Sequence, residues 1–155
     1  MRKKPPRSAP EVITSIKDNA ARVRDAADGM TKRIEQFQVY LGSLRGRVDT
    51  THFGSHPDYG PQDEVDLALR LHRKEKAWVL SWGSYHPIYN DENPMDWQPL
   101  TEAPLRIKIA AVGMFPDLLE AIEKTQIRLA EEIEEVTAEF DAFAESLNKG
   151  GKERA

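Results

Sequence analysis

The sequence predicts a predominantly helical α+β domain. We expect two long heptad helices, N-terminal and C-terminal, packed as an antiparallel coiled-coil hairpin, with a small antiparallel β-hairpin or meander plus one short helix inserted between them. Apolar residues recur alternately three and four positions apart over residues 11–48 and again over residues 115–147, which is the spacing of a heptad seam. Between these segments lie stretches in which apolar and polar residues alternate, as in strands with one buried face.

The N-terminal seam has eleven positions, and all of them are apolar. Pro10 stands where a helix can begin, because its missing N–H would have no intrahelical partner there. Glu11 complements the positive end of the helix dipole. The seam residues are Ile13, Ile16, Ala20, Val23, Ala27, Met30, Ile34, Phe37, Leu41, Leu44 and Val48. We therefore expect a long helix over residues 11–48, and because Gly42 and Gly46 weaken the last turns we place its end between Leu41 and Val48.

The C-terminal seam is equally regular and strongly acidic. Ten acids stand against Lys124 and Arg128 between Asp117 and Leu147. The seam residues are Phe115, Leu119, Ile122, Gln126, Leu129, Ile133, Val136, Phe140, Phe143 and Leu147. Only Gln126 is polar, and a lone polar seam residue can fix the register of a coiled coil. We expect an acidic helix over residues 115–147.

Each seam needs a cover, and the two seams suit each other. The N-terminal segment is near neutral, so it is a better partner for the acidic helix than a second acidic helix would be. In an antiparallel register whose paired residue numbers sum to 163, small residues face large ones; a register with sums near 156 is almost as good. We expect the contact to involve Ile34, Phe37, Leu41, Ile122, Gln126, Leu129, Ile133 and Phe140. An intrachain hairpin is favoured, although an oligomer can use the same seams.

The segment between the seams predicts a small sheet followed by a short helix. We interpret residues 49–64, with two glycines and two prolines, as a loop. Alternation over 65–72 and 77–83 predicts a β-hairpin within an aromatic-rich region, 65–100, and Tyr85 to Tyr89 can add a short strand interrupted at Pro87. Thr101 is a candidate N-cap for a helix over 101–113.

Both chain ends are expected to be disordered around a single domain of residues 11–148. Residues 1–10 form a basic arm with three prolines, and residues 149–155 a polar tail after Asn148. No cysteine is present, which excludes disulfides and thiolate chemistry. No segment is apolar enough for a membrane span, so we expect no membrane association and take a cytoplasmic location as the default.

No motif for catalysis is found. The sequence has no nucleophile elbow, phosphate-binding glycine loop or dinucleotide fingerprint. We therefore expect no enzymatic activity, no catalytic residues and no cofactor. His52 and His56 form a close pair in the predicted loop, and His86 can join them, so an enzyme or a metal protein stays the third interpretation; no metal site is predicted.

A set of basic and aromatic residues is the candidate interaction site. It comprises Arg70, His72, Arg73, Lys74, Lys76, Trp78, Trp82, Tyr85 and Trp97. Positive charge beside aromatic rings is typical of single-stranded nucleic-acid binding. Trp78 and Trp82 share a face with Leu80, however, and are expected to be core residues of a small sheet.

We therefore expect a non-enzymatic coiled-coil protein for protein–protein interaction, an adaptor or regulatory protein that is oligomeric. Its partner would be another protein, itself, or both. A nucleic-acid-binding accessory protein that uses the basic hairpin 70–76 is the alternative.

Overall fold

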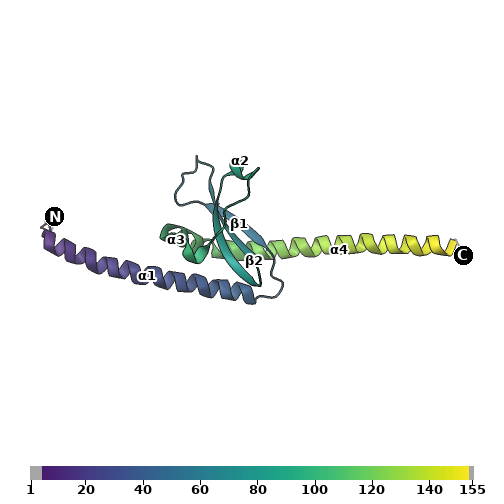
Figure 1. The fold of residues 1–155 in the computed structure, drawn as a ribbon, viewed down its shortest axis with the longest axis horizontal. Coiled ribbons are helices and arrows are strands. Elements are labelled where there is room, and N and C mark those ends of the chain that lie inside the picture. Colours follow the sequence, from purple (N-terminus) through teal and green to yellow (C-terminus); the bar gives the residue numbers. More distant parts are fainter. Residues whose placement is uncertain (1–4, 154–155) are drawn as a thin grey trace.

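The computed structural model describes residues 5–153. A small sheet and short helices form a head, and two long helices leave it (Figure 1). The long helices are α1 (Ala9–Ser43) and α4 (Phe115–Glu153). Between them lie β1 (Thr50–Ser55), β2 (Asp66–Lys74), β3 (Ala77–Tyr85), α2 (Pro87–Asn90), β4 (Gln98–Pro99), the 3-10 turn η1 (Leu100–Glu102) and α3 (Leu105–Gly113). The predicted α+β class is confirmed.

Helix α1 begins slightly before its predicted start and ends within the predicted range of Leu41 to Val48. The Ser8 side chain caps it by accepting the Glu11 backbone N–H at 3.3 Å, which satisfies one of the free donors of the first turn. The helix ends at Ser43, although the apolar spacing continues to Val48. Leu44 leaves the helical conformation with ψ of 142°, and in the turn that follows Gly46 takes a left-handed conformation with φ of 70°, which favours glycine.

The sheet has four antiparallel strands in the order β1-β2-β3-β4. The predicted hairpin is confirmed: β2 pairs with β3 through a two-residue turn at Glu75 and Lys76. Leu67, Leu69 and Leu71 lie on one face of β2, as the alternation predicts. Residues 85–89 do not form a further strand, because β3 ends at Tyr85 and Pro87 opens the short helix α2.

Strand β1 lies inside the segment predicted to be a loop, so that prediction is wrong for residues 50–55. Its sequence is mostly polar and contains Gly54, which lowers strand propensity. The strand forms because β2 offers it a full edge, pairing Thr50 with Leu71 and Ser55 with Asp66. A Cβ atom on Gly54 would lie 2.6 Å from the end of the Met114 side chain, so a larger residue here would require Met114 to move.

The hydrophobic core lies between the sheet and the helices. Leucines of β2 and β3 pack against α1, α3 and α4, and every one of these side chains is almost completely buried. The main members are Ile34, Leu41, Leu67, Leu69, Leu71, Leu80, Ile107, Leu118 and Ile122. Trp78 and Trp82 pack against this cluster, as expected for aromatics on the Leu80 face. The predicted helix 101–113 is divided into η1 and α3, and both parts contact α1.

The long helices do not form the expected antiparallel hairpin within the chain. Phe37 stacks on Phe115 with ring centroids 4.1 Å apart, and the Gln126 Nε2 atom donates to the Gly46 carbonyl at 2.8 Å. Residue numbers rise together in these contacts, so the helices run in the same direction where they meet. Figure 1 shows α1 leaving the head on one side and α4 on the other.

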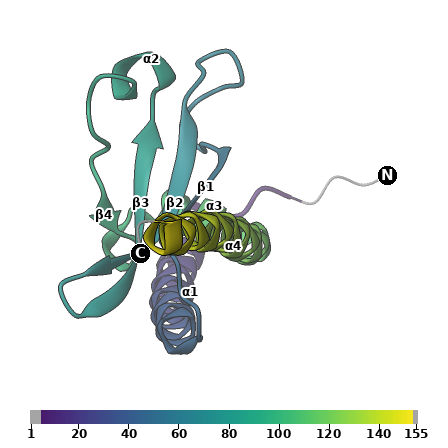
Figure 2. The same ribbon diagram turned by 90° about the vertical axis from the view of Figure 1, so that its right-hand side faces the viewer.

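The sheet explains this arrangement. The C-terminal half of α1 contacts β3 and the beginning of α4 contacts β1, so the head covers the inner half of each seam. Figure 2 shows both helices nearly end-on, with the β1–β2 loop and α2 at the far end of the strands.

The chain ends also differ from the prediction. Helix α4 continues through Gly150 and Gly151 to Glu153, so residues 149–153 are helical rather than a disordered tail. Residues 154–155 of the predicted tail lie outside the described residues, and so do residues 1–4 of the predicted basic arm. The last two arm residues, Ala9 and Pro10, belong to α1.

Candidate interaction surfaces

The outer part of α4 carries an apolar stripe that the chain leaves uncovered. Six seam residues are between 42% and 63% exposed: Leu129, Ile133, Val136, Phe140, Phe143 and Leu147. They follow one another at heptad spacing, so they lie along one side of the helix. Together they form one continuous apolar strip along the free part of α4.

The outer part of α1 carries a second uncovered stripe. Ile13, Ile16 and Val23 are more than half exposed. Towards the head, this stripe enters a groove between α1 and α3. Its lining is almost wholly apolar: Val23, Ala26, Ala27, Met30, Leu105 and Ile109. The Lys108 Nζ atom donates to the Thr31 hydroxyl at 2.8 Å, which fixes α3 beside α1 at one end of this groove.

The predicted seam contacts therefore divide into two groups. Ile34, Leu41 and Ile122 are buried in the head, and Phe37 packs on the same cluster. Leu129, Ile133 and Phe140 are exposed on the free part of α4. Gln126 lies at the boundary, where it binds the Gly46 carbonyl instead of facing a seam partner.

The sheet face away from the core, here called the outer face, gathers several of the predicted interaction residues. Strand alternation places Arg70, His72 and Lys74 of β2 and Tyr85 of β3 on this side. The Arg70 guanidinium lies 5.5 Å from the centre of the Trp97 ring, within the range of a cation–π contact. Five of the nine predicted interaction residues thus lie on the outer face, with Lys74 and Tyr85 at opposite ends of the hairpin.

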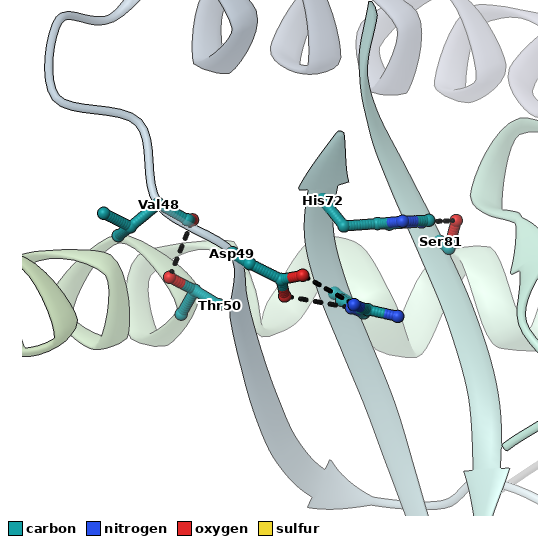
Figure 3. A network of polar contacts seen from close by, with 6 residues as sticks. Val48, Asp49, Thr50, His72 and Ser81 are labelled. Carbon is teal, nitrogen blue, oxygen red and sulfur yellow. Dashed lines mark hydrogen bonds and ion pairs between the residues drawn. The ribbon is translucent and has the colours of Figure 1, made fainter. Parts of the chain in front are cut away.

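Arg70 is held in place by Asp49, which the sequence interpretation did not single out. Its Nε and a terminal nitrogen donate to the two Asp49 carboxylate oxygens at 2.9 and 2.5 Å, a bidentate geometry that Lys cannot reproduce. This hydrogen bonding raises the pKa of Arg70 above its ordinary value. Figure 3 shows Asp49 reaching from the start of β1 towards β2, while the Thr50 hydroxyl donates to the Val48 carbonyl.

A histidine and a serine lie next to this ion pair. The His72 Nε2 and Ser81 Oγ atoms are 2.8 Å apart (Figure 3), and Ser81 is buried. Burial lowers the pKa of His72, and the nearby charge of Arg70 lowers it further. The neutral imidazole is therefore the form that fits this site.

An aromatic pair completes the outer face. The rings of Phe53 and Tyr85 are 4.8 Å apart, and Phe53 remains 45% exposed. Gly83 lies on the same face, and the segment of Met95 and Asp96 packs closely over it. A Cβ atom at Gly83 would lie 2.9 Å from the Met95 side chain and 3.1 Å from the Asp96 carbonyl. Phe53 was missed because its segment was interpreted as a loop, although the alternation of Thr51, Phe53 and Ser55 was a weak signal.

The other predicted interaction residues lie elsewhere. Trp78 and Trp82 are on the inner face against the core, and alternation places Arg73 on that same side. Lys76 is in the hairpin turn. Arg47 covers Trp78, with its guanidinium carbon 5.7 Å from the ring centre.

The predicted histidine cluster lies partly together, at the loop end of the sheet. His56 Nδ1 accepts the Asp58 backbone N–H at 3.1 Å, so a neutral ring carries its proton on Nε2 and donates it to Ser84 Oγ, 2.8 Å away. His56 is thus not oriented to take a proton from Ser84. Tyr59 contacts both His56 and His86, while His52 is in β1.

Burial lowers the pKa of His56, a nearby Asp58 charge opposes this, and His86 adds to the lowering. Among residues 5–153, no three His, Asp or Glu side chains converge closely enough to hold a metal ion.

Comparisons of the chain with protein families, with curated proteins and with solved structures give no match. Within the part of the chain that the structure describes, no helix has the length and apolar character needed to cross a membrane.

Proposed function

We propose that this protein is a non-enzymatic protein, an adaptor or regulatory protein, that acts through protein–protein interaction. It self-associates through its two helical arms, by which we mean the parts of α1 and α4 that extend beyond the head. One observation carries the proposal: the six consecutive seam residues of α4 from Leu129 to Leu147 are exposed. A heptad stripe in water is unstable without a cover, because each apolar side chain gains free energy when it is removed from water. The head, which holds its own core, would then present a surface to a partner.

The test is the mass of the full chain in solution. Light scattering coupled to size-exclusion chromatography, run over a concentration series, should give a defined oligomer that dissociates on dilution. A monomer at every concentration, up to hundreds of micromolar, would contradict the proposal.

The outer face favours a second candidate function, binding of single-stranded nucleic acid. Arg70, Trp97, Tyr85 and Phe53 combine a cation with stacking surfaces on one side of the sheet, which is a typical arrangement for this ligand. The pairing of Arg70 with Asp49 counts against it, because the guanidinium charge is already neutralised.

A labelled oligonucleotide titration at two salt concentrations tests this candidate. Binding should weaken with salt and should be lost in Phe53→Ser. The matched control is Tyr40→Ser, which removes an exposed aromatic from α1, on the core side of the sheet. Absence of binding at low salt would remove this candidate.

A further inference from the structure

We propose that two copies of this chain form a two-fold dimer in which α1 of each copy pairs antiparallel with α4 of the other. The pairing covers about residues 13–30 of one helix and 133–150 of its partner. This inference rests on the proposed function and names the partner as a second copy of the chain.

The directions of the helices make this pairing possible. In one chain both long helices run the same way, and their free parts leave the head on opposite sides (Figure 1). A two-fold axis perpendicular to them reverses the partner's helices. The free part of the partner's α4 then lies on the same side as the free part of α1 and runs against it.

The positions of α1 and α4 along their common direction are compatible with both predicted registers, in which paired residue numbers sum to 163 or to about 156. Residue numbers differ by 78 between Phe37 and Phe115 and by 80 between Gly46 and Gln126. Within one chain, a residue of α4 therefore lies at the same height along the helix direction as the α1 residue about 79 positions earlier; residues at the same height are called level below. The two-fold axis lies midway between paired residues once this offset of about 79 is subtracted from the sum of their numbers. If paired numbers sum to 163, the axis is level with about Gly42, and if they sum to 156, it is level with about Gln38. Both positions lie where α1 passes the head, so the two heads would sit side by side.

In the register whose paired residue numbers sum to 163, called the 163 register, the free parts of α1 and of the partner's α4 end at the same point and their seam side chains are complementary. Pro10, in the first turn of α1, is level with Glu153, the last residue of the partner's α4. From Ile16 to the head, each seam residue of α1 and the α4 seam residue paired with it are both apolar. The pairs are Ile16 with Leu147, Ala20 with Phe143, Val23 with Phe140, Ala27 with Val136, and Met30 with Ile133.

Charge beside the seams favours this pairing over a pair of α4 helices. The positions directly flanking a heptad seam decide which helices pair. In α1 these are Lys17, Asn19, Arg24, Ala26, Thr31 and Arg33, with three cations and no acid. In α4 they are Ala130, Glu132, Thr137, Glu139, Ala144 and Ser146, with two acids and no cation. Two α4 helices would place like charges beside each other, which is destabilising.

The groove between α1 and α3 continues the proposed contact onto the head. Leu105 and Ile109 line it together with Val23, Ala27 and Met30. In the 163 register, Phe140, Val136 and Ile133 of the partner arrive level with those three α1 residues. The exposed faces of α3 would thus be covered by the same helix.

Disulfide cross-linking tests the pairing directly, because the chain contains no cysteine. The double variant Ala27→Cys/Val136→Cys should form a covalent dimer on mild oxidation, whereas each single variant should not. Within one chain the two positions are about 30 residues of helical rise apart, roughly 45 Å, so an intrachain bond cannot form. The double variant Ala27→Cys/Leu129→Cys tests the 156 register in the same way, and circular dichroism checks that each variant is folded.

The outcomes separate this inference from the proposed function. A covalent dimer from either double variant, with monomeric single variants, supports reciprocal pairing and identifies its register. A covalent dimer from Val136→Cys alone shows that two α4 helices pair with each other and overturns the inference. An oligomer by light scattering that neither double variant cross-links overturns the inference but leaves the proposed function standing; a monomer overturns both.

Discussion

The substitution Phe140→Ser should weaken self-association strongly and leave the fold of each chain unchanged. Phe140 is 63% exposed in the single chain, so it contributes little to the stability of the head. In the proposed dimer it lies against Val23 of the partner and beside the groove that α3 lines. The change removes apolar surface only from the contact between chains.

The size of the effect follows from the exposed fraction. Full burial of a Phe side chain contributes about 1.5–3 kcal/mol, so burial of the part left exposed contributes about 1–2 kcal/mol at each contact. The two-fold symmetry gives each dimer two such contacts, and the total is about 2–4 kcal/mol. Because 1.4 kcal/mol corresponds to a factor of ten, the dissociation constant should rise about 30-fold to 700-fold.

Sedimentation equilibrium over a concentration series measures this constant. The matched control is Ile127→Ser. Ile127 is an apolar residue of the same helix that is 51% exposed, and it lies outside the seam. The control should leave the dissociation constant within about a factor of two. An equal loss in both variants, or no loss in Phe140→Ser, would refute the assignment of the contact to the seam.

Three further predictions concern the single chain. Replacing Gln126 with Leu removes the hydrogen bond to the Gly46 carbonyl, so thermal melting should show a loss of about 0.5–1.5 kcal/mol with no change in mass; a higher melting temperature would mean that Gln126 does face a seam. Leu118→Ala, at a fully buried position, should cost about 2–5 kcal/mol in urea unfolding, and a cost below about 1 kcal/mol would contradict its place in the core. Burial lowers the pKa of His72 and His56 in the folded state, so the unfolded chain takes up protons first, and the unfolding free energy should fall as pH drops through about 6.5. His72→Gln should reduce this pH dependence, measured by melting between pH 7.5 and 5.5, and an unchanged slope would contradict the assignment.

The sequence predicted elements better than it predicted their partners. The heptad spacing located both long helices and the alternation located the hairpin, because these patterns arise from side-chain geometry within one element. The direction of helix pairing was wrong within the chain for a related reason. A seam says that one side of a helix is apolar, and it does not say whether a helix, a sheet or a second chain covers it.

Strand β1 and the outer face show a different limit. The segment Thr50–Ser55 carries little apolar signal, and it becomes a strand only because β2 offers a free edge to pair with. Its misassignment also hid Phe53, and it hid the role of Asp49 in fixing Arg70. Residues whose role depends on a long-range pairing cannot be recognised from their neighbours in the chain.

Each seam has two environments although its spacing never changes. The inner residues, such as Ile34 and Ile122, are buried by the head, whereas the outer ones, such as Val23 and Phe140, are exposed. Selection for the core of the head alone would not require apolar residues beyond the head at every seam position of both arms. The antiparallel complementarity of the outer seams therefore has its simplest physical explanation between chains, where the arms can meet, rather than within one chain, where they point apart.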